Sequence, residues 1–364
     1  MGLVRPSYAE VDLGAVAANL DAIRRVVAPA RICAVVKADA YGHGDLPIAE
    51  TALEAGAVCV AVALVEEGIR LREGGIEAPI LLLSEPVLAD APLVIEWRLT
   101  PTVYRPEMIE ALAHLATQPL GVHLKVDTGM HRVGAPPEQA LSLAQSIIAS
   151  PHLGLAGVWS HLAVADEDPV FTNQQRALFE DVLARLAENG IEVSLRHLAN
   201  TAAALLYPGT RHDMVRVGLG MYGLHPCPTT RETASLQPAL RVVSQVSHLQ
   251  RLAAGERPSY GRRRPLQVEA TVATIPIGYA DGVPRLLSSR GGEVAIAGRR
   301  YPLAGTVTMD QILVDVGDDP IALGDEVEIL GSSVPVDEWA ERLGTITYEV
   351  VCGLGPRLPR RYVG

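Results

Sequence analysis

The chain lacks the features that direct a protein into or across a membrane. None of its 364 residues belongs to a run of about 20 apolar residues, and the N-terminus has no apolar signal core. Cysteine is also scarce. The four residues Cys33, Cys59, Cys227 and Cys352 lie far apart with no CxxC pair, which excludes a disulfide-stapled secreted scaffold. We therefore expect a soluble cytoplasmic protein with reduced thiols.

Positive charge is in short supply as well. The formal net charge is -11, and the short C-terminal basic run Arg357–Arg361 does not reverse this balance; we interpret it as a solvated or locally paired tail. Nucleic acids and anionic membranes both attract proteins through concentrated Lys and Arg. Neither is expected as a partner.

What the sequence does contain is a long alternation of apolar runs and amphipathic stretches. Eight runs are predicted as strands, at residues 32–38, 57–63, 79–84, 101–104, 122–127, 156–161, 196–200 and 214–217. Amphipathic stretches with helical spacing lie between them, at residues 46–55, 65–73, 106–116, 137–149 and 173–189. Eight strands with intervening helices predict a parallel (β/α)8 barrel of the TIM type.

The pattern changes after residue 230. Short β-like runs separated by Gly and Pro follow, with one helix expected near residues 336–343. We predict a barrel domain over residues 1–230 and a C-terminal, mainly-β domain over residues 231–364. The opening segment, residues 7–12, also has a strand pattern and could join the β domain.

Lys37 ends the first apolar run of the barrel and precedes a loop-forming stretch, residues 38–44, that contains two glycines. Burial disfavours a charged amine and lowers its pKa, which makes this lysine a candidate nucleophile that forms a Schiff base with an aldehyde cofactor. The segment alone equally allows a strand-end lysine whose stem is buried while its head reaches water.

Other polar residues follow the remaining strands. The ends of barrel strands carry the active site, and here they supply Tyr41, Asp127, Arg132, His161, Asn200, Thr201 and Arg216. This set predicts an anionic ligand and proton-transfer chemistry. Residues 218–223 match GxGxxG, but the following Leu-His-Pro cannot start the helix that a dinucleotide site requires. A phosphate cradle is the better interpretation.

A phosphate cradle opposite a nucleophilic lysine describes pyridoxal 5'-phosphate (PLP). Its aldehyde would condense with Lys37, and its phosphate would be held at Thr201 and Gly218. Arg216 could then face the pyridine nitrogen. Because a guanidinium does not give up its proton, the electron sink would be weak, and quick proton return would be favoured over decarboxylation or transamination.

Several motifs resemble those of the fold-type III, PLP-dependent alanine racemases, and the resemblance covers nearly the whole chain. The segment AVVKADAYGHG at residues 34–44 matches the PLP-lysine signature almost letter for letter. In chain order the other motifs are KVDTGMHRVG at 125–134, HLA at 161–163, RVG at 216–218, SYG at 259–261, GYADG at 278–282 and MDQ at 309–311.

The resemblance assigns roles to individual residues. It implies that Lys37 and Tyr260 are the acid/base groups on opposite faces of the substrate, as two-base racemisation requires. It further implies carboxylate contacts from Arg132 and Met309, and cofactor contacts from Tyr41, Asn200, Thr201, Gly218 and Tyr348. His161 and Arg216 would link Tyr260 to the pyridine ring, and Lys125 stands where many relatives carry a carbamylated lysine.

The resemblance also implies a head-to-tail homodimer with shared active sites, and a product, D-alanine, that supplies peptidoglycan. Three alternatives stay open. A serine or broad-specificity racemase would need only modest changes in the pocket. A metal-dependent barrel hydrolase could use His123, Lys125, His161 and His197, but no histidine pair closes the first strand. A non-catalytic PLP-binding protein would leave the β domain and Tyr260 without a role.

The basic segment Arg262–Arg264 is either an interface or a solvated loop.

Overall fold

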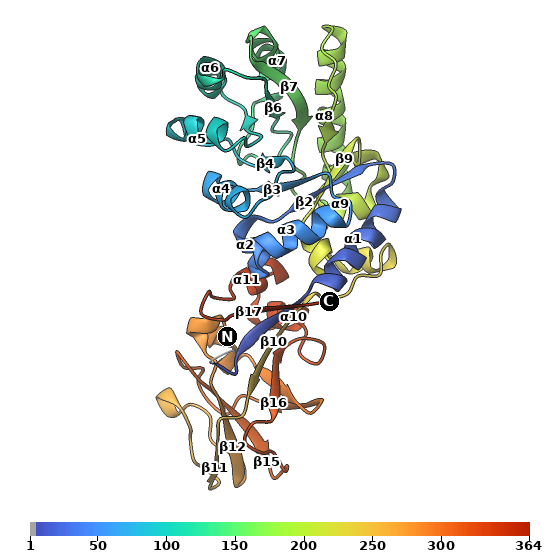
Figure 1. Cartoon of the computed structure of the whole chain (residues 1–364). Helices are drawn as coiled ribbons and strands as arrows, with labels where there is room; N and C mark the ends of the chain where they lie inside the picture. The colour runs from blue at the N-terminus through green and yellow to red at the C-terminus, as the bar shows by residue number, and fades with distance from the viewer. Residues whose placement is uncertain (1–4) are drawn as a thin grey trace. The chain divides into compact units, whose positions relative to one another are not determined.

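The computed structural model describes residues 5–364, which form two compact units (Figure 1). The barrel unit comprises Ala15–Ala40 and Asp45–Gln237. The β unit comprises the N-terminal segment through Gly14, the short stretch Tyr41–Gly44, and Pro238–Gly364.

Eight parallel strands form the barrel unit. They pair in two four-stranded sheets, β4-β3-β2-β9 and β5-β6-β7-β8. A parallel bridge from Leu81 to Thr100 joins the sheets at one seam, and a hydrogen bond of 3.0 Å from the Arg216 N–H to the Ala199 carbonyl joins them at the other. The predicted (β/α)8 barrel is thus confirmed. The strands are β2 (Arg31–Val35), β3 (Cys59–Val62), β4 (Ile80–Leu82), β5 (Thr102–Val103), β6 (Leu120–Lys125), β7 (Leu153–Trp159), β8 (Arg196–His197) and β9 (Met214–Val217).

Helices alternate with these strands along the chain. They are α1 (Leu13–Val27), α3 (Asp45–Glu54), α4 (Val65–Glu73), α5 (Ala91–Glu96), α6 (Pro106–Leu115), α7 (Ala140–Ala149), α8 (Pro169–Glu188) and α9 (Thr201–Leu206). Helices α3, α4, α6, α7 and α8 follow the five predicted amphipathic stretches to within a few residues. Nothing in the sequence predicts α5 and α9, because six residues are too few to show a helical period.

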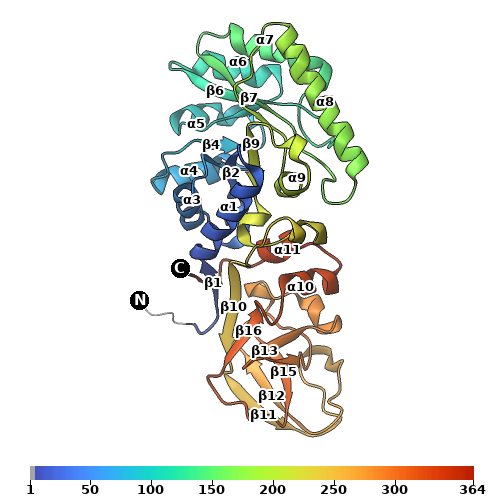
Figure 2. The same ribbon diagram turned by 90° about the vertical axis from the view of Figure 1, so that its right-hand side faces the viewer.

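The β unit contains two sheets. The larger has the strand order β14-β13-β16-β10-β1-β17, and the smaller has the order β11-β12-β15. In the larger sheet, β1 pairs antiparallel with β10 and parallel with β17, so the first and last strands of the chain are neighbours (Figure 2). The elements are β1 (Tyr8–Asp12), β10 (Leu240–Gln245), β11 (His248–Leu252), β12 (Ala270–Ile275), β13 (Glu293–Ile296), β14 (Arg299–Pro302), β15 (Ile312–Gly317), β16 (Glu326–Leu330), α10 (Val336–Leu343), α11 (Thr347–Cys352) and β17 (Arg360–Val363).

The segment after β2 is a left-handed helical turn, α2 (Lys37–Gly42), where the sequence led us to expect a loop. Four consecutive non-glycine residues, 38–41, have φ between +51° and +55°. This conformation costs roughly 1–2 kcal/mol per residue. Hydrogen bonds offset the cost: the Ala38 N–H donates to Glu67 Oε1 (2.6 Å), and the Ala40 N–H donates to the Val36 carbonyl (2.8 Å). The turn fixes the backbone immediately after Lys37.

This strain predicts an unusual response to glycine. Ala38→Gly removes the left-handed penalty at an exposed position, so the free energy of unfolding in urea should rise by about 1 kcal/mol. The matched control is Ala184→Gly on the exposed face of the right-handed helix α8, which should lower it by about 1 kcal/mol. Equal losses in the two variants would contradict this account of the turn.

Candidate active site

Arg216 is a buried cation in the middle of the barrel. It belongs to β9 and is only 3% exposed. Its Nη1 donates to the His197 carbonyl (3.0 Å), and its Nη2 donates to the carbonyls of Ser160 (2.9 Å) and Leu198 (3.0 Å). The guanidinium also lies 4.5 Å from the ring centre of Trp159. Burial lowers the pKa of Arg216 to about 10, which still leaves the group charged at neutral pH.

The charge of Arg216 decides which nitrogen of each neighbouring histidine carries a proton. A guanidinium only donates, so its contact of 3.1 Å with His197 Nδ1 makes that nitrogen an acceptor. The proton of His197 is then on Nε2, which donates to His123 Nδ1 at 2.9 Å. His123 must in turn carry its proton on Nε2. By the same argument His161 accepts at Nδ1, 3.3 Å from Arg216 Nη2.

Burial and the same charge keep these three rings neutral. Burial, followed by the charge of Arg216, lowers the pKa of His123 to about 4. Burial also lowers the pKa of His197, with smaller contributions from His123 and Arg216. The pKa of His161 falls for the same reasons, and the charges of Lys125, Arg132 and Lys37 add to the effect. The three histidines therefore hold and orient protons at neutral pH and carry no charge.

Lys125 ends β6 and is 3% exposed. Its Nζ lies 4.2 Å from the ring centre of Trp159. Burial, and then the charges of Arg216 and Arg132, lower its pKa to about 7, with Lys37 also contributing. A large fraction of this amine is therefore neutral at pH 7. Four cationic side chains act on one another at the C-terminal ends of the barrel strands, which is an environment suited to anions.

The segments that follow β8 and β9 are tied together. The Gly218 N–H donates to Thr201 Oγ1 (3.1 Å), while Asn200 caps α9 by accepting the Ala203 N–H at its Oδ1 (3.0 Å). A Cβ at Gly220 would lie only 2.7 Å from the Thr201 methyl group. The glycine motif therefore forms a close backbone cradle with one short 3-10 turn, η4 (Leu219–Tyr222), and not the long helix of a dinucleotide site.

Tyr41 and Tyr348 form a pair within the β unit. Their ring centres are 5.9 Å apart. Burial, with smaller effects from Tyr348 and Cys352, raises the pKa of Tyr41. The Tyr41 phenol is therefore a hydrogen-bonding group that stays protonated near neutral pH.

Tyr260 and Met309 lie on an exposed surface of the β unit. Tyr260 is 72% exposed and Met309 is 51% exposed. Residues 306–309 connect them, because Thr306 Oγ1 donates to the Tyr260 carbonyl (2.8 Å). Met309, at the end of the same segment, accepts a hydrogen bond at its carbonyl from the Ala280 N–H (3.1 Å). Tyr279, which is 42% exposed, adds a second aromatic ring to this stretch. We call Tyr260, Tyr279 and Met309 the exposed aromatic face.

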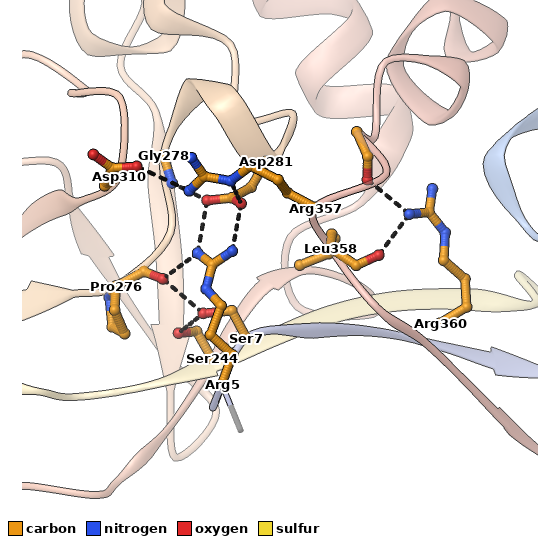
Figure 3. A network of polar contacts seen from close by, with 11 residues as sticks. Arg5, Ser7, Ser244, Pro276, Gly278, Asp281, Asp310, Arg357, Leu358 and Arg360 are labelled. Carbon is orange, nitrogen blue, oxygen red and sulfur yellow. Dashed lines mark hydrogen bonds and ion pairs between the residues drawn. The ribbon is translucent and has the colours of Figure 1, made fainter. Parts of the chain in front are cut away.

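A buried carboxylate holds the backbone beneath Met309. Asp281 accepts two hydrogen bonds from Arg5 (2.6 and 2.9 Å) and one from Arg357 (3.2 Å), and it caps the Gly278 N–H (3.0 Å) (Figure 3). Burial alone would raise the pKa of this carboxyl. The hydrogen bonds and charges outweigh burial, so its pKa lies below the usual value. Arg357 also donates to Asp310 (2.9 Å), which joins the C-terminal segment to the motif that contains Met309.

The basic segment Arg262–Arg264 is exposed. Arg257 reaches back to the carbonyls of Arg262 (3.1 Å) and Arg263 (3.3 Å), and Arg264 donates to the Leu303 carbonyl. The loop is thus closed by contacts within its own unit.

The barrel unit gathers most of the predicted site residues at the C-terminal ends of its strands. They are Lys37, Lys125, Arg132, His161, Asn200, Thr201, Arg216 and Gly218. Tyr41, Tyr260, Met309 and Tyr348 belong to the β unit. Nothing in the sequence indicates the role of Trp159, whose ring contacts both Arg216 and Lys125. It marked His123 and His197 only as possible metal ligands.

In the described part of the chain, no three His, Cys, Asp or Glu side chains are grouped so that they could hold a metal ion. Nor does any helix within residues 5–364 have the length and apolar character to cross a membrane.

The lowered pKa of His123 predicts acid sensitivity. Unfolded histidine binds a proton near pH 6.5, whereas folded His123 binds one only near pH 4, so the free energy of unfolding should fall by about 3 kcal/mol across that interval. Urea unfolding at pH 6.5 and at pH 4.5 measures most of this change. His123→Gln should lose less stability than the wild type over that interval, whereas His152→Gln, at an exposed site, should match the wild type. Identical pH slopes in both variants would contradict the assignment.

Comparison with known proteins identifies the family. The N-terminal domain profile of alanine racemase matches residues 11–226, and the C-terminal domain profile matches residues 239–362. Alanine racemase of Nostoc sp. is 42% identical, with 97% of this chain and 95% of the relative covered. Alanine racemase 2 of Bacillus subtilis is 40% identical, with coverage of 99% and 95%.

Solved structures agree with the sequence comparison. The crystal structure of alanine racemase from E. faecalis superposes with a TM-score of 0.94 at 36% identity over 100% of both chains. That of alanine racemase from Bacillus anthracis with bound L-Ala-P gives a TM-score of 0.93 at 35% identity, over 100% of this chain and 96% of the other. With both domain profiles and nearly the full length matched, the chain belongs to the alanine racemase family.

Proposed function

We propose that this protein is a PLP-dependent alanine racemase that interconverts L-alanine and D-alanine. The observation that carries the proposal is the convergence of Lys37, Lys125, Arg132 and Arg216 at the C-terminal ends of the barrel strands of a chain from this family. An amino-acid carboxylate and a cofactor phosphate are the anions that such a site would bind. In the cytoplasm its product would supply D-alanine for peptidoglycan.

The residues present fit the cofactor. Lys37 would anchor it, and the Thr201–Gly218 cradle would receive its phosphate together with Tyr41 and Tyr348. The close approach of Gly220 to Thr201 supports this assignment, since a Cβ at position 220 would collide with the Thr201 methyl group and push the two segments of the cradle apart. Asn200 shapes the cradle by capping α9. When bound, PLP supplies the electron sink for a negative charge at the substrate α-carbon.

Two proton-transfer groups complete the proposal. Racemisation requires that a proton leave one face of the α-carbon and return to the other, and we assign these faces to Lys37 and Tyr260. Arg132 and Met309 would hold the substrate carboxylate. His161 and Arg216 would connect Tyr260 to the pyridine nitrogen. Because Arg216 stays charged, it would donate a hydrogen bond to that nitrogen without transferring its proton.

Tyr260 would reach the site from a second copy of the chain. The exposed aromatic face, with Tyr260 72% exposed, supports an assembly in which a neighbouring subunit covers it. We therefore propose a head-to-tail homodimer in which each barrel is completed by the partner's β unit.

Deuterium oxide separates racemisation from other PLP reactions. Purified protein incubated with PLP and L-alanine in deuterium oxide should lose optical rotation, and both enantiomers should gain deuterium at the α-carbon. Release of carbon dioxide, or retention of optical rotation, would reject the proposal. Serine tested in parallel measures how broad the specificity is.

The assigned bases predict a complementation pattern. Lys37→Ala should abolish racemisation and the absorbance of the bound cofactor, whereas Tyr260→Phe should keep the absorbance and lose turnover by about two orders of magnitude or more. Co-expressed Lys37→Ala and Tyr260→Phe chains should recover activity, because a mixed dimer contains one barrel with Lys37 that faces an intact Tyr260.

A matched control makes this result decisive. A Tyr279→Phe chain co-expressed with Lys37→Ala shows how much activity any partner restores when Tyr260 is unchanged. Mixed chains that stay as inactive as the separate variants, although dimers form, would place both bases on one chain and contradict the shared site.

Lys125 is proposed as a carbamate. Its neutral amine would attack the carbon of carbon dioxide, forming an N–C bond as one C=O double bond opens and releasing one N–H proton to solvent. A neutral buried amine would thus become an anionic carbamate near Arg132. The burial of Lys125 among like charges favours this change.

Carbon-13 NMR tests the carbamate directly. Protein equilibrated with labelled bicarbonate should show one carbamate resonance that disappears in Lys125→Ala and persists in the Lys37→Ala control. A plain ammonium at Lys125, seen as no resonance at any bicarbonate concentration, would contradict it.

A further inference from the structure

The barrel has a cavity at the N-terminal ends of its strands, opposite to the end that carries the cationic side chains Lys37, Lys125, Arg132 and Arg216. Its volume is about 660 Å³, within the range of small-molecule sites. Arg31 and Leu120 begin β2 and β6, and Met214 begins β9, and all three line the cavity. Lys37, Lys125 and Arg216 lie further along these same strands or just beyond them. The cavity is therefore distinct from the proposed catalytic site.

The walls of the cavity are mainly apolar. Leu81, Ile95, Leu99 and Pro119 contribute to them. An apolar hollow of this size favours a ligand with a hydrocarbon body.

The rim carries two arginines whose charges are not balanced. Arg31 and Arg98 line the cavity and are exposed. Within residues 5–364, neither guanidinium makes a hydrogen bond or an ion pair. Of the neighbouring side chains that line the cavity, none is acidic. Such a rim attracts an anion, and arginine is well suited to grip a carboxylate with two hydrogen bonds.

His123 supplies a donor on the inner wall. It lines the cavity, and its Nδ1 is occupied by the hydrogen bond from His197. Since Arg216 fixes the tautomer of His197, the proton of His123 is on Nε2, the nitrogen with no partner among the described residues. A neutral N–H is thus available to a ligand oxygen at the inner end of the cavity.

We propose that this cavity binds a small carboxylic acid with an aliphatic chain. The carboxylate would lie at Arg31 and Arg98, the chain would fill the apolar interior, and a second oxygen on the chain, where present, would accept from His123. An amine of the same size would be repelled by the two guanidinium groups.

Calorimetry of the PLP-loaded protein tests this assignment. Octanoate is titrated in the presence of saturating alanine, which keeps the probe out of the proposed catalytic site. We expect one octanoate to bind per chain. Octanamide should bind with an affinity lower by about tenfold or more, and octylamine should not bind. Ala156→Leu, which places a larger side chain into the cavity, and the double variant Arg31→Gln/Arg98→Gln should each weaken octanoate binding about tenfold or more.

Arg25→Gln is the matched control, because Arg25 is an exposed arginine on α1 that does not line the cavity. It should bind octanoate as the wild type does. Equal affinity for octanoate and octylamine, or octanoate binding unchanged in both cavity variants, would overturn the proposal. Loss of binding in Arg25→Gln would also overturn it, because the effect would then reflect net charge alone.

Discussion

A single buried charge organises the barrel. Within the described chain the Arg216 guanidinium pairs with no carboxylate; it is satisfied by three carbonyl groups and by the face of Trp159. Burying a charge is expensive unless its donors are all satisfied, so the surrounding backbone must present acceptors. The ends of β7, β8 and β9 meet at this point. Their register and the orientation of the nearby histidines depend on it.

The same charge sets the chemistry around it. Because Arg216 can only donate hydrogen bonds, His197 and His161 accept at Nδ1. The hydrogen bond from His197 Nε2 to His123 Nδ1 then determines the tautomer of His123 as well. The charge of Arg216 therefore determines the positions of histidine protons from the proposed catalytic site to His123, which lines the cavity at the other end of the barrel. Burial, and then the charge of Arg216, also lower the pKa of Lys125, which leaves much of this amine neutral at pH 7.

The sequence predicted the parts of this structure that repeat. Strand and helix alternation located all eight barrel strands, and α4 was placed at its observed residues. The left-handed turn after Lys37 was not predicted, since nothing in four non-glycine residues signals a conformation that distant Glu67 stabilises. Lys37 and Arg216 could be found because strand ends are visible in the sequence. The tautomers of His123, His161 and His197 could not be predicted, because a tautomer depends on hydrogen-bond partners that only the folded barrel brings together.

The central claim is that Arg216 acts as a fixed, charged donor. Nitrogen-15 NMR of histidine-labelled protein at pH 7 tests this most directly, with resonances assigned through single histidine-to-glutamine variants. We predict neutral rings at His197 and His123, each protonated at Nε2 and unprotonated at Nδ1. A proton at Nδ1 of His197, or a charged ring there, would contradict the account.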